Sequence, residues 1–257
     1  MPAAQLGRET VLGKTMLILQ AFTVERTTLS FAELQDRTDL AKATLHRVAN
    51  DLVTAGLLDR TRGRYRLSGL VFELGMRASV ERGLLEVAVP FLQDLYERTH
   101  ETVHLGLREG HEVVYVLKMG GHRQAASPSR IGGRMPLHAT AIGKALLAFS
   151  PPEVRDEVLR GPLRRTAPRT VVNPRVLASQ LDTIVETGVS FEYEESAVGI
   201  VCVGAPVLDG DDDVVAAVSV TGPITRFRPA THATAVRAVA SGIAATHARR
   251  RGRSQPT

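Results

Sequence analysis

The sequence predicts an α/β (α+β) fold in which a small winged helix-turn-helix is followed by a larger domain of helices and strands. Three short helical patterns and an Arg-rich hairpin pattern fill the first 68 residues. From Thr102 onward, apolar residues recur with a period of two, which indicates strands. A long Ala-rich helical pattern, Ala230 to Ala248, completes the second part.

The same patterns place the domain boundaries. Two helical patterns, Leu70 to Glu81 and Leu84 to Thr99, cover the junction between the helix-turn-helix and the sheet. We therefore expect a winged helix-turn-helix at residues 7–68, a linker helix at 69–83, a larger domain at 84–248 and a basic tail at 249–257.

Each helix of the small domain has its own sequence signal. The first ends near Phe22 and has an apolar face made of Leu12, Met16 and Leu19. Ser30 and Glu33 predict a capping box, in which each side chain takes up the other's backbone N–H. The third helix begins near Lys42 and stops at Gly56, the residue expected at a left-handed helix end. Its buried stripe is Leu45, Val48 and Leu52.

The larger domain alternates between sheet and helix. A helix from Thr140 to Phe149 and a Pro-punctuated helical region ending at Thr187 separate two groups of strands. The last two strands are joined by the turn DGDDD. The strands are expected near Val103–Leu107, Val114–Lys118, Ser190–Glu194, Ile200–Leu208 and Val214–Thr221.

The net charge of +5 is unevenly distributed along the chain. Residues 1–68 carry +3, the four arginines within residues 249–257 carry +4, and residues 69–248 carry −2. A basic N-terminal module favours a polyanionic partner, although a small positive balance is also typical of a solvated surface.

The chain shows no sign of export or of a membrane partner. No apolar run approaches the roughly 20 residues that span a bilayer, and the N-terminus lacks the apolar stretch of a signal peptide. The single cysteine, Cys202, cannot form an internal disulfide. We expect a cytoplasmic location.

The exposed face of the third helix carries side chains suited to reading DNA. Arg47 can offer two donors to a guanine, and short polar groups beside it fit the major groove. The hairpin adds arginines for the phosphate backbone or the minor groove. Singly, these features also fit an ordinary amphipathic helix and a solvated sheet edge. The predicted DNA-binding residues are Lys42, Thr44, His46, Arg47, Asn50, Arg60, Arg62 and Arg64.

The segment LQDRTDLAKATLHRVANDLVTAGLL and the basic hairpin behind it resemble the helix-turn-helix of the IclR family. In that family a T-G-L-P-K-S-T-hydrophobic-H-R segment opens the recognition helix. Asp39, Ala41 and Ala43 depart from its Gly, Pro and Ser. Asp tolerates a left-handed conformation, whereas the missing hydroxyl at 43 removes a cap or phosphate contact. The matching residues are Thr38, Leu40, Lys42, Thr44, His46 and Arg47.

Two further segments, residues 132–149 and 195–223, resemble the effector-binding domain of the same family, which has a GAF-like fold. The predicted helix start near Thr140 directs unpaired N–H groups outward, which suits a carboxylate. Serine and threonine in strands are also common fillers, and a lone cysteine is often a small buried hydrophobe. The resemblance implies effector-pocket positions at Ala141, Ile142, Glu192, Cys202, Ser219 and Thr221.

Several motifs typical of enzymes are set aside. His100 and His104 match the H-E-x-x-H string of zinc proteases, but in a strand they would lie roughly 13 Å apart. Gly143-Lys144 lacks the rest of a phosphate-binding loop. A Cys202–His138 nucleophile pair is conceivable because both flank the predicted pocket, but no third group or oxyanion donor supports it. We predict no catalytic residue, cofactor or metal site.

Together these features predict a DNA-binding transcription regulator whose operator binding is modulated by a small organic acid, aromatic acids included. The resemblance implies a homodimer or a dimer of dimers, a tetramer, on pseudo-palindromic double-stranded DNA. Two alternatives stay open: a small-molecule hydrolase with an accessory DNA-binding domain, and a DNA-binding protein whose C-terminal domain is purely structural.

Overall fold

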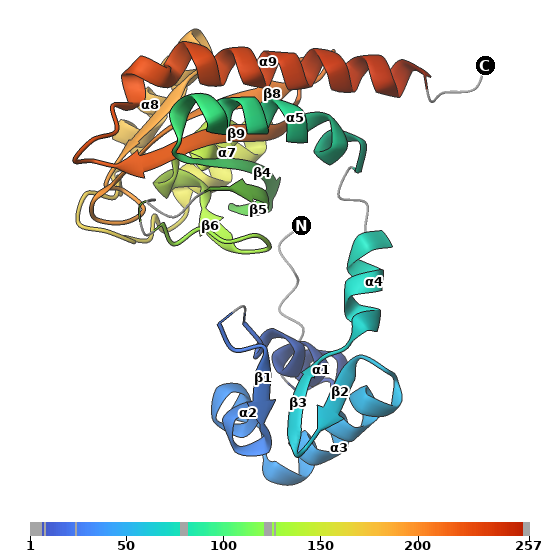
Figure 1. Ribbon diagram of the computed structural model, residues 1–257. Helices are drawn as coiled ribbons and strands as arrows, with labels where there is room; N and C mark the ends of the chain where they lie inside the picture. The colour runs from blue at the N-terminus through green and yellow to red at the C-terminus, as the bar shows by residue number, and fades with distance from the viewer. Residues whose placement is uncertain are drawn as a thin grey trace. The chain divides into compact units, whose positions relative to one another are not determined.

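The computed structural model describes residues 7, 9–23, 25–77, 82–120, 125 and 127–253 (Figure 1). The chain divides near residue 80 into two compact units. Each unit has a hydrophobic core of its own, so the two are described in turn. No helix in the described ranges is long and apolar enough to cross a membrane.

The N-terminal unit is a winged helix-turn-helix, as predicted. Its first three helices are α1 (Val11–Gln20), α2 (Phe31–Thr38) and α3 (Lys42–Thr54). A small antiparallel sheet has the strand order β1-β3-β2. Its strands are β1 (Thr28–Ser30), β2 (Leu58–Thr61) and β3 (Arg64–Leu67). The predicted stripe of α3 is buried in the core of this unit: Leu45, Val48 and Leu52.

Local signals at the helix ends and the hairpin are confirmed. The backbone N–H of Ser30 donates to Glu33 Oε2 over 2.7 Å, and the Glu33 N–H donates to Ser30 Oγ over 3.2 Å. Asp39 adopts the left-handed conformation (φ 56°) that ends α2. The turn between β2 and β3 has positive φ at both Arg62 and Gly63, which matches the right-handed twist of the two strands.

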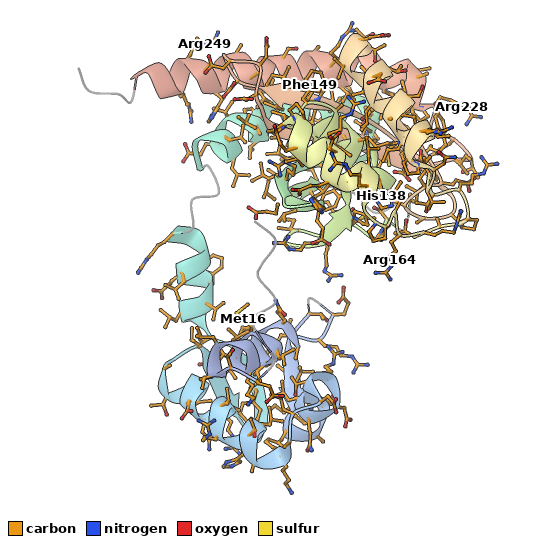
Figure 2. The ribbon with its side chains drawn as sticks, turned by 180° about the vertical axis from the view of Figure 1, so that it is seen from behind. Met16, His138, Phe149, Arg164, Arg228 and Arg249 are labelled. Atoms are coloured by element: carbon orange, nitrogen blue, oxygen red, sulfur yellow. The ribbon has the colours of Figure 1, made fainter. Side chains whose placement is uncertain are left out.

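The apolar face predicted for α1 is wrong. Leu12 is 64% exposed and Met16, labelled in Figure 2, is 41% exposed, whereas Ile18 is fully buried. Leu19, the third member of the predicted face, is partly buried against the core. Because α1 has apolar residues around most of its circumference, the spacing alone does not identify the face that packs.

The linker between the two units begins as a helix. Helix α4 spans Gly69–Arg77, and the next helix, α5, spans Arg82–Thr99. Residues 78–81, which complete the predicted helix, lie outside the described residues. Pro90 lies inside α5, beyond the first turn where proline is best tolerated.

The C-terminal unit is built on a six-stranded antiparallel sheet with the order β6-β5-β4-β9-β8-β7. The strands of one half are β4 (Thr102–Glu109), β5 (Glu112–Met119) and β6 (Arg134–Pro136). Those of the other half are β7 (Ser190–Tyr193), β8 (Ile200–Leu208) and β9 (Val214–Pro223). The central pair, β4 and β9, places His104 opposite Ser219 and Thr102 opposite Thr221.

Helices cover both faces of this sheet. On one face α5 and α9 (Pro229–Arg253) lie side by side and pack on the valines of β8 and β9 (Figure 1). The other face is covered by a 3-10 turn and three helices: η1 (Leu137–Ala139), α6 (Ala141–Ala148), α7 (Pro152–Arg160) and α8 (Pro174–Thr187). Helix α9 continues to Arg253, so the first five residues of the predicted basic tail are helical.

The start of α6 approaches the sheet closely. A Cβ at Gly204 on β8 would lie 3.1 Å from the carbonyl carbon of Ala141 and 2.8 Å from Ser190 Oγ. The Ser190 hydroxyl donates to the Ala141 carbonyl over 2.6 Å and fixes the helix start to the edge strand β7. Only glycine leaves room for this approach.

We predict that Gly204→Ala lowers the free energy of unfolding of the C-terminal unit by about 1–3 kcal/mol, because the added methyl group meets backbone atoms. Gly210→Ala is the matched control, since nothing lies within 4 Å of the added atom there. Urea unfolding followed by circular dichroism measures both. Equal unfolding midpoints for Gly204→Ala and the wild type would show that this approach is not a constraint.

Candidate nucleic-acid interface and ligand cavity

Helix α3 presents a polar face away from the core of the N-terminal unit. Lys42, His46 and Arg47 are exposed, and Thr44 and Asn50 are half-buried beside them. Neighbouring side chains restrain this face. The Asn50 amide lies 3.2 Å from His46 Nδ1, and Arg47 Nη1 lies 3.8 Å from the carboxylate of Asp51. These surface contacts are weak, so Arg47 is available to another partner.

The wing arginines differ in what they already bind. Arg62, at the tip of the hairpin, has no recorded partner in the described part of the chain. The Arg60 guanidinium lies 5.3 Å from the centre of the Tyr65 ring. Arg64 donates to the carbonyl of Thr28 over 3.0 Å and to Glu33 over 3.1 Å.

The Arg64–Glu33 contact belongs to the start of α2. The backbone N–H and hydroxyl of Ser30 lower the pKa of Glu33, and the Arg64 guanidinium adds to this effect. Glu33 therefore stays ionised and holds Arg64. Arg64 would have to break this ion pair to contact a phosphate. Arg62 could contact a phosphate without breaking an ion pair with any described residue.

In the C-terminal unit, one enclosed cavity lies between α6 and the strands β4, β8 and β9. All six predicted effector-pocket residues line it, so the structure brings together residues that are up to 80 positions apart. Six further residues line it that the sequence reasoning missed: His104, Tyr115, Ser127, Met135, Thr140 and Ser196.

The first residues of α6 and its cap, Thr140, Ala141 and Ile142, line this cavity. Thr140 caps the helix, and its hydroxyl accepts from the Gly143 N–H over 3.0 Å. The Lys144 N–H donates to the Thr140 carbonyl. This leaves the N–H groups of Ala141 and Ile142 as the donors that a bound anion would meet, at the positive end of the helix dipole.

The sheet side of the cavity carries hydroxyl, thiol and carboxyl groups. Cys202 and Thr221 are paired across β8 and β9, and their Sγ and Oγ1 atoms lie 3.1 Å apart. Glu192 on β7 accepts from the N–H of Ser196 over 2.9 Å and from its hydroxyl over 2.7 Å. Ser219 points to the same face of β9 as Thr221, as the alternation predicted.

A buried histidine completes the network. His104 Nε2 lies 2.7 Å from Ser129 Oγ, and its Nδ1 lies 3.4 Å from Ser219 Oγ. The Lys118 ammonium donates to the Ser129 carbonyl over 2.6 Å. The alternation of β4 and its pairing with β9 were signals that could have placed His104 beside Ser219.

Burial controls the charge of these groups. It lowers the pKa of His104 to about 3, and the ammonium of Lys118 acts in the same direction. It raises the pKa of the Tyr115 phenol and of the Cys202 thiol. It also raises the pKa of Glu192, against the effect of hydrogen bonds from Cys202 and Ser196. At neutral pH the cavity therefore offers a neutral imidazole, phenol and thiol.

Cys202 and His138 do not flank the same cavity, so the structure does not support a nucleophile pair. His138 does not line the cavity that holds Cys202; its Nε2 lies 3.0 Å from the carbonyl oxygen of Arg164 (Figure 2). A reactive thiol also needs a lowered pKa, and that of Cys202 is raised. His100 follows the end of α5 and His104 lies in β4, so the H-E-x-x-H string is not helical. Within the described ranges, no cluster of three metal-ligating side chains occurs.

The cavity is nearly closed. Its volume is about 10 Å³, which is room for a single water molecule. A ligand larger than water therefore has to displace the side chains around it.

Comparisons with known proteins agree for both units. The sequence model of the IclR helix-turn-helix domain family matches residues 11–62. The family model of the bacterial transcriptional regulator IclR C-terminal domain matches residues 76–245. Among curated proteins, the HTH-type transcriptional regulator XynR of Escherichia coli (strain K12) is 34% identical over 211 residues, which is 81% of this chain and 84% of that protein. KdgR of the same organism is 34% identical over 217 residues, covering 83% and 82%.

Solved structures show the same architecture. A crystal structure of an IclR homolog from Microbacterium hydrocarbonoxydans, complexed with 4-hydroxybenzoate, superposes with a TM-score of 0.86 at 30% identity. The match covers 94% of this chain and all of that one. Thermotoga maritima IclR superposes with a TM-score of 0.74 at 30% identity, covering 94% and 98%.

Proposed function

The chain belongs to the IclR family of bacterial transcriptional regulators, and on that premise we propose that a small carboxylic acid, bound in the cavity under α6, changes its affinity for an operator. DNA binding is the common function of this family. The α3 face and the wing described above are the surfaces that we assign to it. The observation that carries the ligand proposal is that Ala141 and Ile142, at the start of α6, line the same cavity as Ser219 and Thr221.

The chemistry of the cavity favours a carboxylate. Backbone N–H groups at a helix start bind anions, and charged hydrogen bonds are about twice as strong as neutral ones. Burial also raises the pKa of Glu192, which reduces the repulsion that its carboxyl exerts on an incoming anion. The relative crystallised with 4-hydroxybenzoate makes this acid the first one to test.

The small volume of the cavity suggests how a ligand would act at a distance. An acid the size of 4-hydroxybenzoate needs far more than about 10 Å³, so binding selects a more open arrangement of the unit. A ligand that binds the open arrangement more tightly than the closed one shifts the protein toward the open arrangement. If the two arrangements differ in operator affinity, the resulting change is typically about 1–3 kcal/mol.

Further features of the proposal follow from the family. A homodimer would present two α3 helices to a pseudo-palindromic site, and a dimer of dimers would engage two such sites. We place the regulator in the cytoplasm, where its DNA is. We also propose the domain limits 7–68, 69–83, 84–248 and 249–257; the described part of the linker helix ends at Arg77.

The first prediction concerns DNA reading by α3. Arg47→Ala should weaken binding to an operator selected from a random library by about 1–3 kcal/mol and leave binding to random duplex nearly unchanged, because Arg47 reads a base. Arg62→Ala should weaken binding to both duplexes and flatten the salt dependence by about one unit, as expected for a lost phosphate contact. Fluorescence anisotropy across a salt series measures these effects.

The control for both variants is Arg175→Ala, which removes an exposed arginine of α8 in the other unit. It should bind both duplexes like the wild type. Equal losses on selected and random DNA for Arg47→Ala would reduce Arg47 to a phosphate contact. An unchanged salt slope for Arg62→Ala would remove the wing tip from the interface.

The second prediction concerns the cavity. Ala141→Phe should abolish binding of 4-hydroxybenzoate, because the ring fills the space beside the donors, while operator binding is retained. Ser219→Ala combined with Thr221→Val should lower the affinity for the acid by about tenfold to a hundredfold, since a hydrogen bond to a charged group contributes about 1.5–3 kcal/mol. Isothermal titration calorimetry gives the affinities.

Ala238→Phe, which adds the same ring at an exposed position of α9, is the control and should bind the acid like the wild type. If the acid binds all four proteins equally well, the effector site lies elsewhere. If the protein hydrolyses an ester of the acid, such as methyl 4-hydroxybenzoate, as proton NMR would detect, the hydrolase alternative replaces the receptor.

A further inference from the structure

A second cavity lies along the free edge of the sheet, beside strand β7. Its volume is about 420 Å³, within the range of about 300–1,000 Å³ typical of small-molecule sites. Residues of α6, α8, β7 and α9 line it, and we call it the edge groove. It shares no lining residue with the cavity under α6.

Strand β7 separates the two cavities through the alternation of its side chains. Glu192 faces the cavity under α6, whereas Phe191 and Tyr193 line the edge groove. The Phe191 and Tyr193 rings are stacked, with centroids 6.3 Å apart and planes 23° from parallel. With Ile184 and Val189 they make an apolar wall suited to a flat ring.

The cationic groups of the edge groove differ in how far they are already satisfied. Lys144 is 1% exposed, and its ammonium donates to both oxygens of Glu195, over 2.8 and 3.0 Å, and to Gln180 over 3.1 Å. All three donors of this ammonium are used and its charge is neutralised. Lys144 therefore offers nothing to a ligand.

Arg237 on α9 is different. It is exposed, and its Nη1 donates to the Thr187 carbonyl over 3.2 Å. No acidic partner of Arg237 is found among the residues that the structure describes. The Arg237 guanidinium thus lies at a largely apolar groove with N–H donors still unused. Its positive charge and these donors can bind an anion.

We propose that the edge groove is a second small-molecule site, specific for a planar aromatic anion, with the ring on Phe191 and Tyr193 and the anionic group on Arg237. This site is independent of the effector site proposed above. Its donor set is a side-chain guanidinium, whereas the cavity under α6 offers backbone N–H groups and hydroxyls.

A fluorescence titration tests this assignment. The chain contains no tryptophan, so Tyr193→Trp introduces a single indole at a position that is 45% exposed. The probe is 4-nitrobenzoate, an aromatic carboxylate whose nitro group quenches indole emission on contact. We expect saturable quenching, and we expect it to persist when Ala141→Phe is added, because Ala141 lines the cavity under α6 and not the edge groove.

Three changes in the Tyr193→Trp background make the test specific. Arg237→Gln should lower the affinity for 4-nitrobenzoate by about fivefold, as expected for a partly exposed charge pair. The uncharged 4-nitrobenzamide should bind the Tyr193→Trp protein about fivefold more weakly than the acid does. Its affinity should not change when Arg237→Gln is added. Ala233→Phe should fill the groove and abolish saturable quenching, while Ala238→Phe, on the exposed side of the same helix, should not.

Circular dichroism and unfolding midpoints establish that each variant is folded, and Arg237→Gln, at an exposed position, keeps the test valid if Ala233→Phe does not fold. Linear, non-saturable quenching in every variant would overturn the proposal. So would equal affinities for the acid and the amide. Emission that changes with protein concentration alone would show that a second copy of the chain covers the groove.

Discussion

The close approach of α6 to the sheet is the contact on which the functional architecture of the C-terminal unit depends. Gly204 leaves room for the Ala141 backbone, and the Ser190 hydroxyl ties that backbone to β7. The helix start is thereby held above Cys202 and Thr221. Three residues further along, Lys144 reaches Glu195 in the wall of the edge groove. One helix thus forms part of two cavities.

The polar groups that line the cavity under α6 are hydroxyls, an imidazole, a thiol and the carboxyl of Glu192. Burial keeps His104 and Cys202 uncharged. A thiol with a raised pKa is a poor nucleophile, so these side chains suit a binding site better than a catalytic one. Because the cavity is small, we expect a ligand to bind only together with a rearrangement of the side chains around it.

Much of the architecture could be predicted from short-range signals. The Ser30–Glu33 box, the left-handed Asp39 and the alternation that puts Ser219 and Thr221 on one face depend on neighbours in sequence, and all three occur. The face of α1 was missed because apolar residues surround the helix and only tertiary packing selects Ile18. His104 and Tyr115 were missed as cavity residues because strand pairing, not spacing, brings them to Cys202. The closed state of the cavity depends on the packing of twelve side chains, which no sequence pattern encodes.

We propose above that a carboxylate binds at the start of α6. An NMR titration of the isotopically labelled protein with 4-hydroxybenzoate, following the amide protons, tests this binding site. We expect saturable downfield shifts for Ala141 and Ile142, because their N–H groups acquire a charged acceptor. Saturable shifts confined to other amides, with these two unchanged, would contradict it.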